Sequence, residues 1–270
     1  MVKRIVYILA AVLLCGCEVI REEDRLIPVA PSGNASRTHV LIEYTGFLCV
    51  NCPNAAETAQ TLIDTYGEEQ LIVVAMHPAT NHFTQTKKAE YDYTCSEADS
   101  CYLFMGGTVS TPFPTGNIDA VKTENGYFID PKDWAAQLQT MNSADTPPYL
   151  EIEAAATDTT TRVVELTIQT YAESPLECRM ALWLVEDSVP GAQMMPNGKT
   201  NTQYYHRHML RSTAGGSPWG KEMNVEPVLT SHYAEMTVPE KCDIAKCAVV
   251  AVLLDKKDYH ILQAKQIHLQ

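Results

Sequence analysis

His39-Val-Leu-Ile-Glu-Tyr-Thr-Gly-Phe-Leu-Cys-Val-Asn-Cys52 is the most informative stretch of the chain. Its first six residues form an apolar run of strand-forming side chains. The segment 53–66 then carries apolar side chains at helical spacing, and 70–77 is a second apolar run typical of a buried strand. The cysteine pair therefore opens a helix directly after a strand, within a predicted βαβ unit.

A cysteine at the start of a helix is favoured as a thiolate, because unpaired backbone N–H groups and the positive end of the helix dipole lie there. We therefore predict Cys49 as the nucleophile of thiol-disulfide exchange and Cys52, one turn later, as the resolving thiol. An inert structural disulfide is the alternative. A zinc site with Cys95 and Cys101 is disfavoured, because their spacing is wide for a zinc knuckle. We expect no metal and no cofactor.

The strand, the C-x-x-C pair and the helix resemble the thioredoxin superfamily over about 37–143. The resemblance implies that Glu43 is a buried base for Cys52, with its pKa raised by burial. It also implies that Pro112 is a cis-proline. Thr111, which precedes this proline, would then present backbone atoms to the substrate.

The chain departs from the thioredoxin motif at two places. Leu48 replaces the tryptophan, and Val50-Asn51 replaces the glycine and proline, so redox potential and direction cannot be inherited. An insertion between 77 and 108 holds Cys95 and Cys101. We expect this pair to form a local disulfide that clamps a helical excursion, or else to be a second exchangeable dithiol.

Beyond Thr146-Pro147-Pro148 helical periodicity almost disappears. Short strand-like runs separated by Asp, Gly, Pro and Ser predict an immunoglobulin-like β-sandwich over 149–270. The fold class is thus α/β plus all-β, a thioredoxin-like domain at 37–145 followed by the sandwich. The runs are 149–156, 162–171, 178–185, 203–211, 232–238, 247–254 and 259–267.

The remaining cysteines and several histidines fall in this second region. Cys178 and Cys247 begin the two most apolar runs, so we expect a disulfide from Cys178 to either Cys242 or Cys247. His206 and His208 share one face of the run 203–211 and with His232 could line a metal site. A structural polar network is the preferred interpretation.

The N-terminus has the layout of a bacterial secretion signal. Lys3 and Arg4 precede an apolar run over 5–14 that is too short to span a bilayer. Leu14-Cys15-Gly16-Cys17 resembles a lipobox, which implies a signal peptide over 1–16 and acylation of Cys17. The acyl chains would anchor the chain to a membrane, and 17–36 reads as a polar tether.

Without Lys3 and Arg4 the chain has 18 basic and 33 acidic residues and a net charge near −15, so nucleic acid is not an expected partner. His206-Arg-His-Met-Leu-Arg211 and Gly215-Gly-Ser-Pro-Trp-Gly220, with the run at 247–254, resemble the C-terminal module of a Gram-negative outer-membrane lipoprotein family. The resemblance implies an outer membrane lipoprotein that faces the periplasm or the cell surface.

Two functions are compatible with these residues. The first is thiol-disulfide exchange on protein thiols or disulfides through Cys49 and Cys52. The second is surface adhesion or assembly, in which the thioredoxin-like part is a scaffold and its cysteines are structural. Burial of both sulfur atoms would favour the second function. The oligomeric state is left open.

Overall fold

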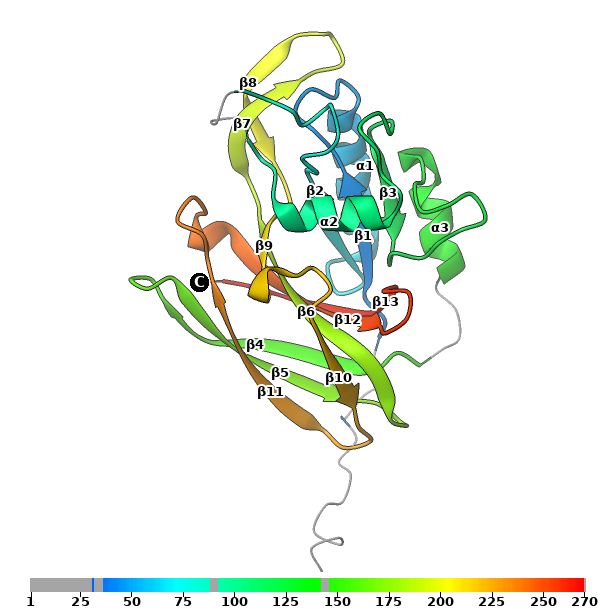
Figure 1. Ribbon diagram of the computed structural model, residues 1–270, viewed down its shortest axis with the longest axis vertical. Coiled ribbons are helices and arrows are strands. Elements are labelled where there is room, and N and C mark those ends of the chain that lie inside the picture. Colours follow the sequence, from blue (N-terminus) through cyan, green and yellow to red (C-terminus); the bar gives the residue numbers. More distant parts are fainter. Residues whose placement is uncertain (1–30, 32–35, 88–91, 142–145, 270) are drawn as a thin grey trace, which may run out of the picture.

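The computed structural model describes residues 31, 36–87, 92–141 and 146–269, and it is mostly β-sheet with few helices (Figure 1). The predicted signal peptide 1–16, the lipidated Cys17 and nearly all of the tether 17–36 lie outside the described residues. Among the helices that are described, none has the length and apolar character that a membrane span requires.

The predicted βαβ unit is present. β1 (His39–Tyr44) and β2 (Leu71–Met76) are parallel neighbours, and α1 (Cys52–Tyr66) connects them. Every residue of both strands is buried. β3 (Thr115–Ile118) lies antiparallel on the other side of β1. This arrangement places the end of β1 and the start of α1 side by side.

Helices cover both faces of this small sheet, because successive side chains of a strand point to opposite faces. α1 and α3 (Trp134–Met141) pack on the face that contains Leu41 and Leu71. α2 (Ser96–Phe104) packs on the face that contains Val40 and Ile42. α3 is preceded by a short 3-10 turn over Pro131–Asp133.

The C-terminal part consists of strands joined by turns, as the sequence predicts. Its strands are β4 (Tyr149–Asp158), β5 (Val163–Tyr171), β6 (Leu176–Glu186), β7 (Val189–Met194), β8 (Thr200–His206), β9 (Met209–Thr213), β10 (Lys221–Val225), β11 (Thr230–Thr237), β12 (Cys247–Asp255) and β13 (Ile261–His268).

One sheet runs through both predicted domains, in the order β13-β12-β6-β9-β2-β1-β3, with β10 also paired to β6. β9 forms the link, because it pairs antiparallel with β6 and parallel with β2 through Met209 and Ala75. The smaller sheet β11-β5-β4 packs against its C-terminal half around an apolar core that includes Leu166, Leu184 and Val249. The boundary at 146–148 stays a prediction.

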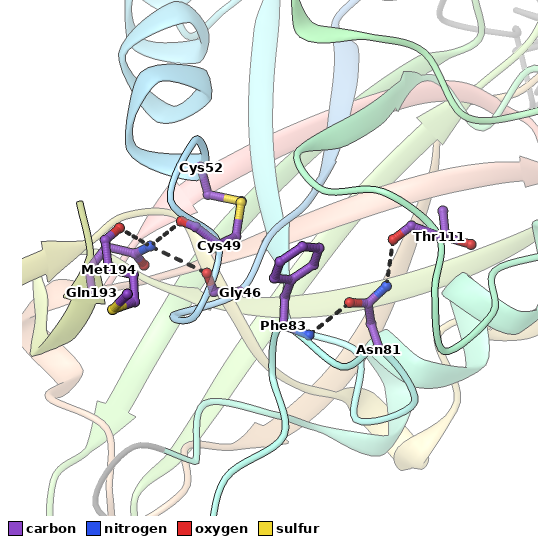
Figure 2. Close-up of a disulfide and its surroundings, with 8 residues drawn as sticks. All are labelled: Gly46, Cys49, Cys52, Asn81, Phe83, Thr111, Gln193 and Met194. Carbon is purple, nitrogen blue, oxygen red and sulfur yellow. Dashed lines mark hydrogen bonds between the residues drawn. A yellow bond between two sulfur atoms is a disulfide. The ribbon is translucent and has the colours of Figure 1, made fainter. Parts of the chain in front are cut away.

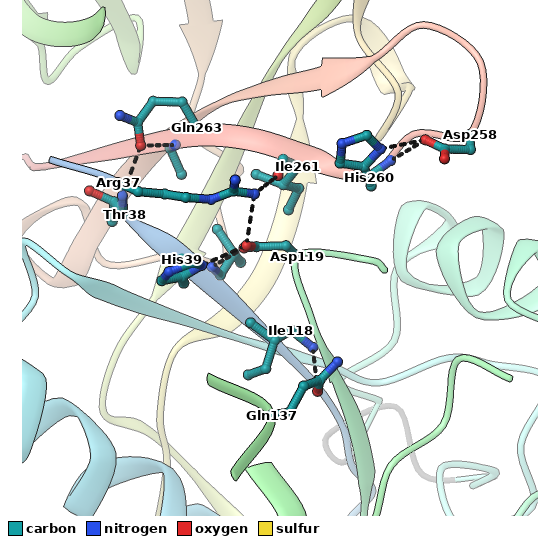
Figure 3. Close-up of polar contacts among 12 residues, drawn as sticks. Arg37, Thr38, His39, Ile118, Asp119, Gln137, Asp258, His260, Ile261 and Gln263 are labelled. Atoms are coloured by element: carbon teal, nitrogen blue, oxygen red, sulfur yellow. Dashed lines mark hydrogen bonds and ion pairs between the residues drawn. The ribbon is translucent and has the colours of Figure 1, made fainter. Parts of the chain in front are cut away.

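A buried polar network fastens β1 and β3 to β13 at the base of the sheet (Figure 3). Asp119, which follows β3, accepts hydrogen bonds from the backbone N–H of Val40 at 2.7 Å and contacts His39 Nδ1 at 2.6 Å. Arg37 donates to Asp119 and to the backbone carbonyl of Ile261. These contacts join parts of the chain that are far apart in sequence.

Two expectations about strands need correction. The run 203–211 is not one strand, because Arg207 and His208 interrupt it and His208 has a positive φ of 51°. β8 therefore turns away with β7 as a separate hairpin, whereas β9 enters the large sheet. β7 and β10 were not among the predicted runs.

The predicted disulfide between Cys95 and Cys101 is absent, and both thiols are free. Cys95 is the N-cap of α2 and Cys101 lies within this helix. Six residues of helix separate their Cα atoms by about 9 Å, at a rise of 1.5 Å per residue. A disulfide requires less than about 7 Å, so the continuous helix prevents the bond.

The predicted disulfide from Cys178 is also absent, and Cys178, Cys242 and Cys247 are all free thiols. In the antiparallel pairing of β6 with β12, Cys178 lies opposite Asp255 whereas Cys247 lies opposite Glu186. Eight residues of strand, about 27 Å, thus separate Cys178 from Cys247. The register of β6 against β12 therefore excludes a disulfide between Cys178 and Cys247.

Candidate functional site

Cys49 and Cys52 form a disulfide where β1 leads into α1. Cys52 is the first residue of the helix, Asn51 is its N-cap, and Pro53 occupies the first turn. The backbone N–H of Cys49 donates to the carbonyl of Gly46 at 3.0 Å, which closes the loop. The sequence motif is therefore correctly placed at a helix start, and its sulfurs are bonded to each other.

Both cysteines are buried, although their neighbours in the loop are not. Cys49 is 1% exposed and Cys52 is 2% exposed, whereas Leu48 and Val50 on either side of Cys49 are 39% and 36% exposed. The two cysteines belong to the same apolar cluster as Tyr44. An external thiolate could reach the disulfide only if side chains of this packed cluster moved aside.

The β7–β8 hairpin of the C-terminal part covers one side of the cysteine loop (Figure 2). The buried side-chain amide of Gln193 donates to the carbonyl of Cys49 at 2.8 Å and to that of Gly46 at 3.4 Å. The backbone N–H of Met194 donates to the carbonyl of Phe47 at 2.8 Å. Each bond joins the hairpin to the loop that contains Cys49, so the chain closes its own site.

The connection between β2 and α2 covers another side. The carbonyl of Phe83 accepts a hydrogen bond from the backbone N–H of Leu48 at 3.0 Å. A side chain at Gly46 would collide with the backbone of Phe83, so this close approach requires glycine. The Phe83 ring packs against the apolar cluster that includes both cysteines and lies 5.9 Å from the Phe113 ring.

The predicted substrate-binding residues Thr111 and Pro112 need correction. The cis bond is Phe113–Pro114, not Thr111–Pro112. β3 begins at Thr115 and pairs with Tyr44 at the end of β1, so Pro114 is the proline that adjoins this end of the sheet. The carbonyl of Thr111 is already occupied by the side-chain amide of Asn81 at 2.9 Å (Figure 2).

Glu43 lies under the helix start, as the resemblance implied. Its side chain is buried, and Oε1 has no hydrogen-bond partner in the part of the chain that the structure describes. Burial raises the pKa of Glu43 to about 8. Since an unpaired buried carboxylate is strongly disfavoured, the carboxyl group is protonated near neutral pH.

A small cavity of about 20 Å³ separates Glu43 and Cys52 from the hairpin. It is lined by His77 and His206 as well as by Gln193. A cavity needs roughly 10–15 Å³ to hold one water molecule, so this space accommodates a single water among polar groups. Glu43 and Cys52 therefore share a polar cavity beneath the disulfide.

Two buried histidines complete the polar lining of this cavity. The rings of His77 and His206 lie 5.7 Å apart, and both contact the Tyr93 ring. Burial lowers the pKa of His206 to about 4 and that of His77 well below its usual range. Both are neutral at pH 7, so neither histidine favours a thiolate, and the cationic side chain that lines the cavity is that of Arg207. No local sequence pattern indicates that His77 and His206 meet.

The three histidines considered as a metal site are not gathered. His206 contacts the carbonyl of Ala192, and His232 Nε2 lies 2.9 Å from the Thr170 hydroxyl on the small sheet. In the described ranges, one group of three potential ligands lies within 4.8 Å, and it contains none of these histidines. It consists of Asp255, Asp258 and His260.

Comparison with known proteins places this chain in a family. The family described as "Outer membrane protein Omp28" matches residues 108–270, which is more than half of the chain. The chain belongs to the Omp28 family. The expected location, that of an outer membrane lipoprotein, is confirmed by this membership.

One solved structure supports the fold of this Omp28-family protein. HBP35 of Porphyromonas gingivalis is 16% identical with a TM-score of 0.67, over 88% of this chain and 77% of that chain. A domain of the outer membrane lipoprotein Omp28 from the same organism is 16% identical with a TM-score of 0.32, over 45% of this chain and 94% of that chain. No curated protein matches. The similarity to HBP35 concerns the fold alone.

Proposed function

We propose that this protein is a non-catalytic binding lipoprotein, with a thioredoxin-like part as scaffold and an immunoglobulin-like sandwich that makes the contacts. The observation that carries the proposal is the burial of both cysteines in the apolar cluster, with a hairpin of the same chain packed against their loop. A disulfide that exchanges with proteins has to be reached by an external thiolate. Here Gln193 and Met194 occupy one side of the cysteine loop.

A groove in the sandwich supplies the contact surface. A cavity of about 760 Å³ opens between the two sheets, where β5 and β11 face β6 and β10. Its size lies within the usual range for ligand sites. In the part of the chain that the structure describes, β10 pairs only with β6 and β11 only with β5, so each has one open edge. Apolar side chains line the groove, among them Leu166, Met180, Leu182, Met223 and Ala234.

The charge of the groove favours a basic partner. Glu165 and Glu235 lie directly opposite each other on β5 and β11, and both are exposed. Like charges in this position repel each other, and neither carboxylate has an ion pair among the described residues. An extended segment with alternating basic and apolar residues would pair with an open strand edge and offset this repulsion. We therefore propose such a segment of a partner protein as the occupant.

A binding experiment with defined peptides tests the groove. The probes are an eight-residue peptide of alternating lysine and valine and its counterpart with glutamate in place of lysine. The basic peptide should bind the full chain, and Ala234→Trp, which fills the groove, should weaken binding by at least about 10-fold. Tyr205→Ser, a change of an exposed side chain on β8, should leave affinity unchanged. Equal binding of the two peptides, or no binding, would contradict the proposal.

An activity measurement tests the scaffold role separately. Wild-type protein and Cys49→Ser should both leave the spontaneous rate of exchange of a fluorescent peptide disulfide unchanged. Turnover by the wild type that Cys49→Ser abolishes would establish exchange chemistry instead.

Thiol-disulfide exchange is the second candidate, and buried Glu43 favours it. A substrate thiolate would attack Cys49 Sγ and break the Cys49–Cys52 bond, and Cys52 would leave with the proton of Glu43. A second substrate thiolate would then attack the substrate sulfur bonded to Cys49, so that the substrate dithiol is oxidised and the protein reduced. This reaction requires displacement of the hairpin, and Gln193→Ala should then show turnover that the wild type lacks.

A further inference from the structure

A second pair of cysteines lies at the start of β12, away from the C-x-x-C loop. Cys242 precedes a short 3-10 turn over Ile244–Lys246, and Cys247 follows it as the first residue of β12. The two residues are 4% and 1% exposed, and both are free thiols. Their side chains share a hydrogen bond, so the two sulfur atoms are neighbours.

The backbone around this pair is held firmly on both sides. The guanidinium of Arg162 donates to the carbonyls of Val238, Pro239 and Cys242, at 3.0, 2.9 and 2.6 Å. The backbone N–H of Leu269 donates to the carbonyl of Cys247 at 2.9 Å. The turn therefore presents its two thiols to each other in a fixed arrangement.

A buried cation adjoins one of the thiols. Arg211 Nε lies 3.3 Å from Cys242 Sγ and 3.1 Å from a carboxylate oxygen of Glu186. The hydrogen bond from Cys247, aided by Arg211, lowers the pKa of Cys242 to about 7, whereas the pKa of Cys247 is raised. Cys242 is thus the more readily ionised thiol of the pair, and Cys247 is the thiol that donates to it.

The other free thiols have different surroundings. Burial raises the pKa of Cys95 and of Cys178 to about 11, and it raises that of Cys101 as well. None of the three adjoins an arginine in the described hydrogen bonds and ion pairs. Cys242 and Cys247 therefore differ from the other free thiols, because their sulfur atoms are neighbours and an arginine lies beside one of them.

We propose that Cys242 and Cys247 form a second disulfide in the exported protein, through exchange with a protein or small-molecule disulfide. An outer membrane protein passes through an oxidising compartment, which supplies such disulfides. Because both cysteines are buried, the turn opens locally to admit the external disulfide, and the Cys242 thiolate attacks one of its sulfurs and releases a first thiolate. Cys247 then loses its proton to that thiolate and attacks Cys242 Sγ, which releases the second thiolate. Two thiols of this chain are oxidised, and one external disulfide is reduced.

Peptide mapping of the full chain purified from the membrane tests this proposal. The protein is unfolded in iodoacetamide without reductant and digested with trypsin, which cleaves after Lys241 and Lys246 and so separates the two cysteines. The expected product is a linked pair of peptides that is lost on reduction. Alkyl groups on both Cys242 and Cys247, even after the folded protein has been incubated with oxidised glutathione, would overturn the proposal.

Variants provide an independent check. In Cys242→Ser, Cys247 should become fully alkylated, whereas Cys178→Ser should keep the linked peptides. Arg211→Met should slow closure of the bond by oxidised glutathione by roughly 3–10-fold, because the thiolate fraction of Cys242 falls. An unchanged rate in a folded Arg211→Met protein would contradict the role given to the arginine.

Discussion

The two cysteine pairs of this chain differ in the groups that surround their sulfur atoms. Cys49 and Cys52 are joined at a helix start, above a protonated carboxyl group and neutral histidines, and a hairpin of the same chain covers their loop. Cys242 and Cys247 are free thiols beside a buried arginine. The C-x-x-C spacing draws attention to the first pair, yet the arginine that donates directly to a sulfur atom, at 3.3 Å, lies beside the second.

The largest expected effect on stability is that of replacing Arg211, the cation beside the second cysteine pair. Arg211 and Glu186 form a buried ion pair, so Arg211→Met leaves an unpaired carboxylate and should lower the free energy of unfolding by about 3–5 kcal/mol. Denaturant unfolding measures this loss. Arg207→Met is the matched control, because Arg207 is exposed, and it should change stability by less than about 0.5 kcal/mol. Similar effects for the two variants would remove the special role of the cation.

The next largest effect is a pH dependence of stability that arises from Glu43, near the Cys49–Cys52 pair. The pKa of Glu43 is raised to about 8 in the folded protein, so between its unfolded value of 4.5 and 8 the folded state holds a proton that the unfolded state has lost. Stability should therefore fall as pH rises, by about 3 kcal/mol from pH 5 to pH 8. Glu43→Gln should abolish this contribution.

Unfolding measured across this pH range tests the carboxyl group directly. Glu57→Gln, a change of an exposed carboxylate on α1, should retain the full pH dependence of the wild type. A wild-type profile that is identical to that of Glu43→Gln would mean that Glu43 ionises normally in the folded protein.

A smaller effect is expected for the contact that closes the first pair. Gln193→Ala removes the buried side-chain donor to the carbonyls of Gly46 and Cys49, which keep only their backbone donors, and should lower the free energy of unfolding by about 1–3 kcal/mol. It should also speed reduction of the Cys49–Cys52 bond by dithiothreitol, because the hairpin separates more readily. Gln203→Ala, on the exposed surface of β8, should do neither. Equal reduction rates in all three proteins would show that the hairpin does not protect the bond.

The smallest effect on stability is expected for Val50, on the surface of the Cys49–Cys52 loop. Val50 is partly exposed between the two cysteines, so Val50→Ser should change the free energy of unfolding by less than about 0.5 kcal/mol. It should also leave the reduction rate of the disulfide unchanged. Faster reduction would mean that Val50, rather than the hairpin, shields the sulfur atoms.

The sequence predicted what depends on local periodicity. The apolar runs at 39–44 and 71–76, with the helical pattern between them, correctly placed the cysteine pair at a helix start. Burial of Glu43 agrees with the position that the family resemblance gave it. These features follow from patterns within a single stretch of chain.

The hairpin that covers the Cys49–Cys52 loop could not be predicted from local sequence patterns. β7 reads Val-Pro-Gly-Ala-Gln-Met, in which Pro190 and Gly191 resemble turn residues rather than a strand. Its contact with the loop at 46–49 joins segments that are far apart in sequence. The predicted pairing of Cys178 with Cys247 failed for the same reason, since the register of β6 against β12, and not the spacing along the chain, determines which sulfur atoms meet.

The central claim is that the folded chain closes its own C-x-x-C site. Iodoacetamide labelling of Cys49 in the presence of dithiothreitol, followed by mass spectrometry over time, tests it most directly. The account predicts that labelling of the folded wild-type protein is at least about 100-fold slower than labelling of the same protein in guanidinium chloride. Labelling of the folded protein at the rate of the unfolded chain would contradict the claim.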